Sequence, residues 1–313
     1  MTGNNRLFRL LDSGADKLSA PMLDGILEAC AELADLNLNN DILKQLVNDY
    51  AQLEQKNYKL LREISEKQQT IEEDLAAAGR IQKGLFPQKL PELEHYCFNW
   101  ECLPCDKMGG DLINIIPYDE ENWIFYIIDV SGHGPRAAMI TVALSQFLNP
   151  FNRGRSQFDH LSPAETLREL EAEFPFERFE SFFTIVYGTL HLPSGNVRMC
   201  NAAHPFPLLI DGKSAVFVEE NNPVIGLKLT DDWQETQITL SEKNRLYLYT
   251  DGLTEARNNL NEQFGEKRLL KAAESLKNLN CNEFVTAIKS SLTDFSEGRI
   301  FDDDFSWLLL GKR

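Results

Sequence analysis

The clearest hydrophobic pattern in the chain is the apolar run at residues 123–128, which ends on Asp129. A short, continuous apolar run without a polar side is typical of a strand that is buried on both faces. Residues 129–134 then supply two glycines, and residues 135–148 begin with proline and carry apolar residues at helical spacing. The pattern therefore predicts a strand, a glycine-rich loop and a helix, with a carboxylate at the end of the strand.

The same arrangement of apolar strand, acid and glycine recurs along the chain. Asp111 follows two glycines and precedes an apolar strand, and Asp251 follows the apolar run 245–249. The acids at 302–304 adjoin the last apolar strand. A lone Asp-Gly pair usually marks a turn, but four acids at strand ends favour convergence on one site. Carboxylates gathered without basic partners repel one another, so divalent cations such as Mg²⁺ or Mn²⁺ are the expected counter-charge.

Residues beyond Pro87 alternate short apolar segments with loops. Apolar alternation near residues 98–102 and a turn at 193–195 predict half-buried strands and a hairpin. Helical spacing is confined to a few stretches between the strands, at 135–148, 163–174, 265–277 and 282–296. Many strands with few connecting helices favour packed sheets with helices outside, rather than a regular βαβ repeat.

A heptad pattern precedes this region. Apolar residues occupy most a and d positions from Leu43 to about residue 66, and Asn57 falls at an a position, where a polar residue favours a two-stranded parallel coil. Lys67 and Asp74 then occupy d positions, and the apolar stripe shifts phase at Leu75. The pattern predicts a dimeric coiled coil, the alternative being one amphipathic helix that packs on the next domain.

The chain therefore divides into three predicted parts. Residues 1–40 alternate short amphipathic helical signals with breakers and form a helical regulatory module, residues 41–86 form the coiled coil and a linker helix, and residues 87–313 form the main domain.

Charge, hydrophobic content and cysteine usage exclude several classes of function and location. A formal net charge of −17 without a basic stripe argues against binding to nucleic acid or to an anionic membrane. No apolar signal-peptide core and no run of about 18 apolar residues occurs, so the protein is expected in the cytoplasm. The six scattered cysteines are expected to be reduced. Cys102 and Cys105 have CxxC spacing but no second pair, which favours two core thiols over a zinc site.

Several short motifs occur between residues 86 and 306, in a fixed order. They are Phe86-Pro87, Gly109-Gly110-Asp111, Asp129-Val-Ser-Gly-His-Gly134, Asn201-Ala-Ala-His-Pro205, Tyr249-Thr-Asp-Gly-Leu-Thr-Glu-Ala256, Phe264-Gly265 and Asp303-Asp304-Phe-Ser306. In order and spacing this set resembles the metal-dependent (PPM-type) protein serine/threonine phosphatases, specifically the bacterial branch of stage II sporulation protein E and RsbU. The resemblance covers residues from roughly 80 to 313.

The resemblance implies a fold and a metal site. The fold would be α+β, a four-layer αββα sandwich of two antiparallel sheets, with two Mn²⁺ or Mg²⁺ ions between the sheets. Matched position by position, Asp111, Asp129, Asp251 and Asp303 would be the catalytic metal ligands, together with the carbonyl of Val130.

The resemblance also implies a function. The protein would remove phosphate from phosphoserine or phosphothreonine on a regulatory protein, and the branch suggests a phosphorylated anti-anti-sigma protein with a STAS domain, in a partner-switching pathway of signal transduction and stress response. The N-terminal helices would form a homodimer and gate the activity under an upstream regulator. The alternative is a catalytically weak or silent sensor or scaffold that binds a partner, but it would need a missing metal ligand, and all four acids are present.

Three positions depart from the branch. Asn114 replaces its usual acid, Lys107-Met108 replaces the acid that commonly precedes the glycine pair, and Ala203 replaces a glycine. Of the two histidines in the motifs, His204 is expected to be structural. His133 either positions water or protonates the leaving oxygen, or packs beneath its loop.

Overall fold

A computed structural model describes residues 40–87, 93–132, 134–151, 159–299 and 303–313. Most of the predicted N-terminal helical module and His133 lie outside the described residues. The chain forms two compact units, Met1–Asp74 and Leu75–Arg313. None of the described helices combines the length and apolar character needed to cross a bilayer.

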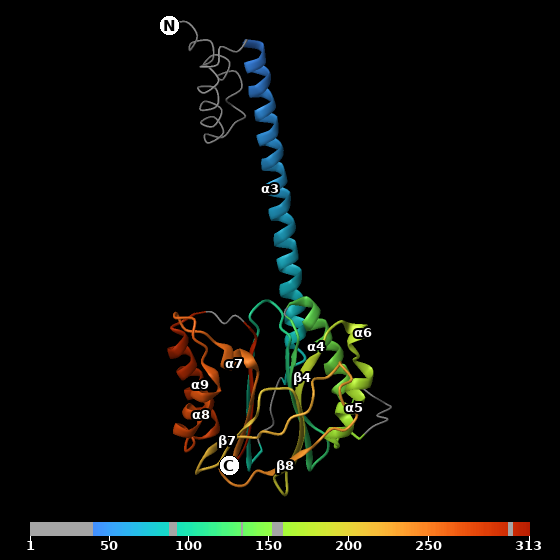
Figure 1. Cartoon of the computed structure of the whole chain (residues 1–313), viewed down its shortest axis with the longest axis vertical. Helices are drawn as coiled ribbons and strands as arrows, with labels where there is room; N and C mark the ends of the chain where they lie inside the picture. Colours follow the sequence, from blue (N-terminus) through green and yellow to red (C-terminus); the bar gives the residue numbers. More distant parts are fainter. Residues whose placement is uncertain (1–39, 88–92, 133, 152–158, 300–302) are drawn as a thin grey trace. The chain divides into compact units, whose positions relative to one another are not determined.

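The long helix α3 (Asn40–Lys83) contains the predicted heptads (Figure 1). It runs without interruption because no proline occurs in it and its first glycine is Gly79. Apolar side chains at heptad positions stay in solvent, with Leu53 56% and Ile64 59% exposed. An exposed apolar stripe on a single helix is what a coiled-coil partner would cover, so dimerisation remains a prediction.

The second unit contains two five-stranded antiparallel sheets. The first sheet has the order β1 (Tyr96–Leu103), β10 (Phe305–Lys312), β9 (Arg245–Tyr249), β6 (Leu208–Ile210) and β7 (Ala215–Phe217). The second has the order β2 (Asp111–Pro117), β3 (Asn122–Val130), β4 (Phe183–His191), β5 (Asn196–Ala202) and β8 (Thr236–Thr239).

Helices cover the outer face of each sheet (Figure 1). The second sheet packs against α4 (Pro135–Leu148) and α5 (Pro163–Glu173), followed by the short α6 (Phe176–Phe179). The first sheet packs against α8 (Gly265–Ser275) and α9 (Cys281–Ser296), preceded by the short α7 (Asp251–Glu255). The predicted αββα sandwich of two antiparallel sheets is confirmed.

Strand β3 is buried on both faces, as its apolar run predicts. Its even-numbered residues, such as Ile124 and Ile128, pack in the core beneath α4 and α5. Its odd-numbered residues, such as Phe125 and Ile127, pack in the core between the two sheets. Because side chains alternate along a strand, Asp129 belongs to the face between the sheets.

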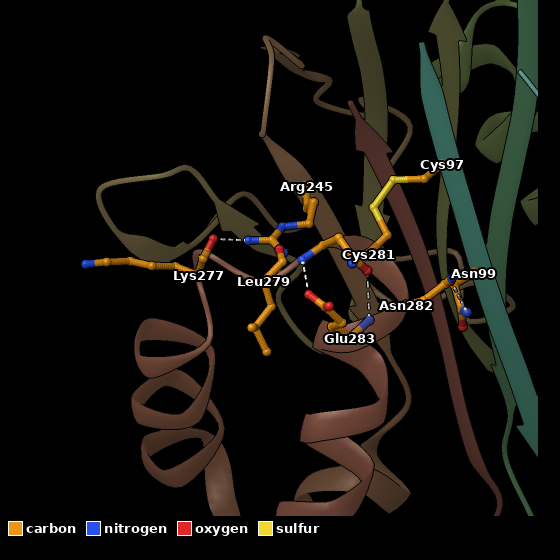
Figure 2. The surroundings of a disulfide bond; sticks show 9 residues. Cys97, Asn99, Arg245, Lys277, Leu279, Cys281, Asn282 and Glu283 are labelled. Atoms are coloured by element: carbon orange, nitrogen blue, oxygen red, sulfur yellow. Dashed lines mark hydrogen bonds between the residues drawn. A yellow bond between two sulfur atoms is a disulfide. The ribbon is translucent and has the colours of Figure 1, made fainter. Parts of the chain in front are cut away.

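A disulfide joins Cys97 on β1 to Cys281 at the start of α9 (Figure 2). The expectation that all six cysteines are reduced is therefore wrong for these two. The two cysteines have a sequence separation of 184, and only the fold brings β1 beside α9, so their pairing could not be predicted from the sequence. Cys102, Cys105 and Cys200 are free thiols.

Candidate metal centre

Four acids gather at one end of the sandwich, two from each sheet. Asp111 begins β2 and lies directly opposite Asp129 on β3. Asp251 follows β9 as the first residue of α7, and Asp303 lies just before β10. The structure thus brings together the four acids that the sequence singled out, and no described basic side chain forms an ion pair with any of them.

Burial changes across the cluster from one acid to the next. Asp111 is 2% exposed, Asp129 and Asp251 are partly buried, and Asp303 is exposed. The cluster is therefore closed on the side of Asp111 and open to solvent on the side of Asp303, so a ligand could approach from the latter side.

The acids raise one another's pKa. Burial, then the charges of Asp251 and Asp303, raise the pKa of Asp129 to about 7. Burial, then Asp303 and Glu255, raise the pKa of Asp251 to about 6. Burial and the charge of Asp129 also raise the pKa of Asp111 well above its ordinary value. Carboxylates that are held close together without cations take up protons at a higher pH than isolated ones, so the cluster is short of positive charge. Its all-oxygen donor set therefore fits hard divalent cations.

The loop before β2 approaches the carbonyl of Val130. Gly110 accepts a hydrogen bond from Val130 N at 3.2 Å. A Cβ atom at residue 110 would lie 2.7 Å from the Val130 carbonyl oxygen. Glycine is needed here because any side chain would press on that oxygen. The assignment of this carbonyl as a ligand remains a prediction.

Asp304 organises the site and was missed by sequence reasoning. It is 4% exposed, and its Oδ2 accepts hydrogen bonds from Gly110 N at 2.5 Å and Asp111 N at 3.4 Å. Its Oδ1 accepts from Cys105 N at 2.8 Å. The sequence alone does not show which of the three acids at 302–304 would accept these backbone hydrogen bonds. Because both oxygens bind backbone N–H groups, Asp304 holds the β2 loop in place.

The Cys105 thiol lies beside this loop. One ligand atom from each of Cys105, Asp303 and Asp304 lies within 4.8 Å of the others. Burial, then the charge of Asp304, raise the pKa of Cys105 to about 12. The side chain is thus a neutral thiol at physiological pH, and the carboxylates remain the better cation ligands.

Gln82, in the last turn of α3, contacts the same loop. Its Nε2 donates to Gly109 O at 2.7 Å and to Thr141 Oγ1 at 2.9 Å, and its Oε1 accepts from Gly109 N at 3.2 Å. Gln82 is 4% exposed, so these bonds satisfy a buried amide. The last turn of α3 is therefore hydrogen-bonded to Gly109, two residues before Asp111. The sequence gave no indication of this contact.

Two of the three departures from the family pattern, Asn114 and Ala203, lie outside the four-acid cluster. Asn114 lies three residues after Asp111 on β2, so the two side chains are on opposite faces of the sheet. The Asn114 Nδ2 donates a hydrogen bond to Leu85 O at 3.3 Å. Ala203 has φ of 53°, a left-handed conformation that favours glycine. Neither replacement removes a carboxylate from the four-acid cluster.

His204, which is expected to be structural, is buried in the fold. It is 2% exposed, and its Nδ1 lies 2.8 Å from Thr184 Oγ1. Burial lowers its pKa to about 3, so the ring is neutral.

Comparison with known proteins gives a family match. The family model described as Stage II sporulation protein E (SpoIIE) matches residues 119–312. Phosphoserine phosphatase RsbP of Bacillus subtilis (strain 168) is 29% identical over 153 residues, which cover 47% of this chain and 37% of that protein. Phosphoserine phosphatase RsbU of the same strain is 23% identical over 249 residues, which cover 79% of this chain and 72% of that protein. The chain thus spans little more than a third of RsbP.

Solved structures share the fold. The SiaA-PP2C domain of Pseudomonas aeruginosa matches with a TM-score of 0.66 and 19% identity, covering 78% of this chain and 97% of that one. The RsbU and RsbW domains of Rv1364c from Mycobacterium tuberculosis match with a TM-score of 0.58 and 22% identity, covering 71% and 61%. RsbX in complex with magnesium matches with a TM-score of 0.50 and 15% identity, covering 72% and 99%.

Proposed function

The chain belongs to the stage II sporulation protein E family, and from this premise we propose that residues 87–313 form a metal-dependent protein serine/threonine phosphatase. The observation that carries the proposal is the convergence of Asp111, Asp129, Asp251 and Asp303 from both sheets without a basic partner among the described residues. Related proteins named phosphoserine phosphatases support the same reaction.

We further propose that the four acids and the Val130 carbonyl hold two Mn²⁺ or Mg²⁺ ions. The raised pKa values of Asp129 and Asp251 support this assignment, because cations would replace the protons that those carboxylates otherwise take up. The magnesium complex of RsbX, which shares the fold, agrees with it. Such ions supply an activated water and offset the charge of the phosphate oxygens.

The chain's own residues prepare this site. Asp304 fixes the backbone of Gly110 and Asp111, and Thr250 Oγ1 donates to Asp111 Oδ2 at 2.9 Å, so the Asp111 carboxylate is held in one orientation. The exposed Asp303 marks the side from which a phosphoserine side chain of a protein could enter. The competing function, a silent sensor or scaffold, would require a missing metal ligand. All four expected acids are present and lie together.

For the substrate, we propose a phosphorylated STAS-domain protein of the anti-anti-sigma type. The basis is the family, since RsbP and RsbU are both phosphoserine phosphatases. A pull-down with an Asp251→Asn variant of the full chain, followed by identification of bound phosphoproteins, would test this. Recovery of phosphoproteins without a STAS domain would overturn the substrate assignment and leave the reaction itself in place.

We also propose that the N-terminal helices gate the activity as a homodimer under an upstream regulator. Two contacts support a mechanical connection, namely the Gln82 bonds to Gly109 and the close approach of Gly79 to the β2 loop. A Cβ atom on residue 79 would lie 2.1 Å from Lys107 O. A shift of the last helical turn would therefore disturb the backbone that leads to Asp111.

The reaction is tested with the purified full chain, a phosphoserine peptide, and Mn²⁺ or Mg²⁺. We expect phosphate release that EDTA abolishes. A folded protein that releases no phosphate with either metal would contradict the proposal.

Gating is tested separately with Gln82→Ala. We expect this variant to change kcat, whereas Gln69→Ala, which removes only an exposed bond to Glu73 on the same helix, should not. A monomeric mass for the full chain in solution would count against the dimer.

A further inference from the structure

A cavity of about 860 Å³ lies away from the acid cluster, beside the edge where β1 and β10 approach the start of α9. It lies within the size range of small-molecule sites. Its lining includes Lys243, Arg245, Lys277, Lys312 and Arg313.

The lining is strongly basic. Among the described lining residues, five are lysine or arginine and none is aspartate or glutamate. This contrasts with the whole chain, in which 48 acids outnumber 31 bases. Lys277 pairs with Glu274, but no described carboxylate forms an ion pair with Lys243, Arg245 or Lys312. An acidic protein would repel anions elsewhere, so this cavity is a local exception.

Arg245 is the buried centre of this charge. It is 3% exposed, and its two terminal nitrogens donate to the carbonyls of Lys277 and Leu279 (Figure 2). Its Nε has no hydrogen-bond partner among the described residues. The Phe284 ring lies 5.1 Å from the guanidinium carbon, so two carbonyls and this ring offset part of the cost of burying the charge, and no described carboxylate does so.

The N-terminus of α9 adjoins the cavity. This helix has 16 residues, its N-cap is Asn280, and Asn280, Cys281 and Asn282 all line the cavity. Asn280 Oδ1 accepts from Glu283 N at 3.0 Å and Glu283 Oε2 accepts from Asn280 N at 3.1 Å, so this terminus is capped by the chain itself and the positive potential of the cavity comes from its basic side chains.

From the basic lining and the buried charge of Arg245, we propose that this cavity binds a small anion with two or more phosphate groups, such as pyrophosphate or a nucleoside triphosphate. The volume of the cavity fits a small molecule, and the basic side chains, with no aspartate or glutamate among the described lining residues, disfavour a cation. Tyr96, Phe98 and Leu93 provide an apolar side that could hold a nucleoside. The site is separate from the phosphatase centre and does not depend on it.

Isothermal titration of the metal-free full chain tests the proposal. Without divalent metal, the four-acid cluster repels phosphate, so binding there does not interfere. The titrants are pyrophosphate, ATP and inorganic phosphate, at low ionic strength. We expect pyrophosphate or ATP to bind more tightly than inorganic phosphate, and higher salt to weaken binding. Tighter binding of ATP than of pyrophosphate would assign a nucleoside phosphate, and equal binding an inorganic polyphosphate.

The test variant is Lys243→Ser with Lys312→Ser, which leaves the buried Arg245 and its hydrogen bonds in place. We expect its affinity to fall at least about tenfold. The control, Lys267→Ser with Lys271→Ser, removes two exposed lysines of α8 outside the cavity and should stay within about twofold of wild type. Absence of binding to the wild-type protein at millimolar pyrophosphate, or equal losses in the two double variants, would overturn the proposal.

Discussion

Thr250 Oγ1 donates a hydrogen bond of 2.9 Å to Asp111 Oδ2, and this bond joins the two sheets at the acid cluster. Thr250 follows β9 of the first sheet, and Asp111 begins β2 of the second. The same hydroxyl accepts from Ser306 N at 3.0 Å. Both residues are buried, so water cannot replace these bonds.

Replacing Thr250 with valine should therefore destabilise the fold. We expect the free energy of unfolding to fall by about 1–3 kcal/mol, because the variant leaves a buried carboxyl oxygen and an N–H group without partners. Urea denaturation measures the loss. Thr250→Ser keeps the hydroxyl and should lose less, so equal losses in the two variants would argue that the hydrogen bonds contribute little.

Asp251→Asn should abolish phosphate release. We expect activity to fall at least about 100-fold, since the variant removes an expected metal ligand. Its melting temperature in EDTA should equal or exceed that of wild type, because one of the mutually repelling charges is gone. Glu120→Gln, in an exposed turn, serves as the control. An active Asp251→Asn protein would rule out a catalytic role for this acid.

Stability of the metal-free protein should depend on pH through Asp129. Its pKa in the folded state is about 7, against an ordinary value of 3.8. The folded state therefore holds more protons than the unfolded state between these values, so the free energy of unfolding falls as pH rises through this window. Melting temperatures in EDTA at several pH values measure the slope. The slope should be smaller in Asp129→Asn, and an unchanged slope would exclude this group as its source.

Gly252→Ala should disrupt the site, because its Cβ would lie 2.0 Å from the backbone oxygen of Asp304. We expect a loss of about 1–3 kcal/mol in unfolding free energy and reduced activity. Gly212→Ala is the matched control, since a Cβ there meets nothing within 4 Å. Equal stabilities of the two variants would show that the loop near Asp304 can move aside.

The Cys97–Cys281 disulfide should be detectable by thiol labelling. Protein that is purified without reductant and then denatured should label two fewer thiols than a reduced sample. Mass spectrometry should find the peptides that contain these two cysteines joined. Labelling of both residues in the unreduced sample would show that the bond does not form under those conditions.

The sandwich and the four acids were predictable because their signals are local. An apolar run that ends on Asp129, and the similar run before Asp251, place each acid at the end of a buried strand. The family resemblance then predicted that the four acids meet at one site. Asp304 could not be told apart from its neighbours, because its role depends on N–H groups nearly 200 residues earlier.

Gln82 and the disulfide were missed for a similar physical reason. The Gln82 amide and the Gly109 backbone become partners only when the helix end packs on the β2 loop. Helical periodicity indicates which positions are apolar, but gives no sign that a buried amide has a distant partner. The basic cavity likewise gathers residues from several separate segments of the chain.

The two-sided burial of β3 also limits which changes of length the chain can tolerate. Deleting one residue within β3 would exchange the residues that face the helices with those that face the other sheet, and it would turn Asp129 away from Asp251. Substituting one apolar residue for another of similar size alters only local packing. Insertions and deletions in this part of the chain are therefore expected to be tolerated in the turn at 118–121, where the side chains are mostly exposed, and to be inactivating within the strand itself.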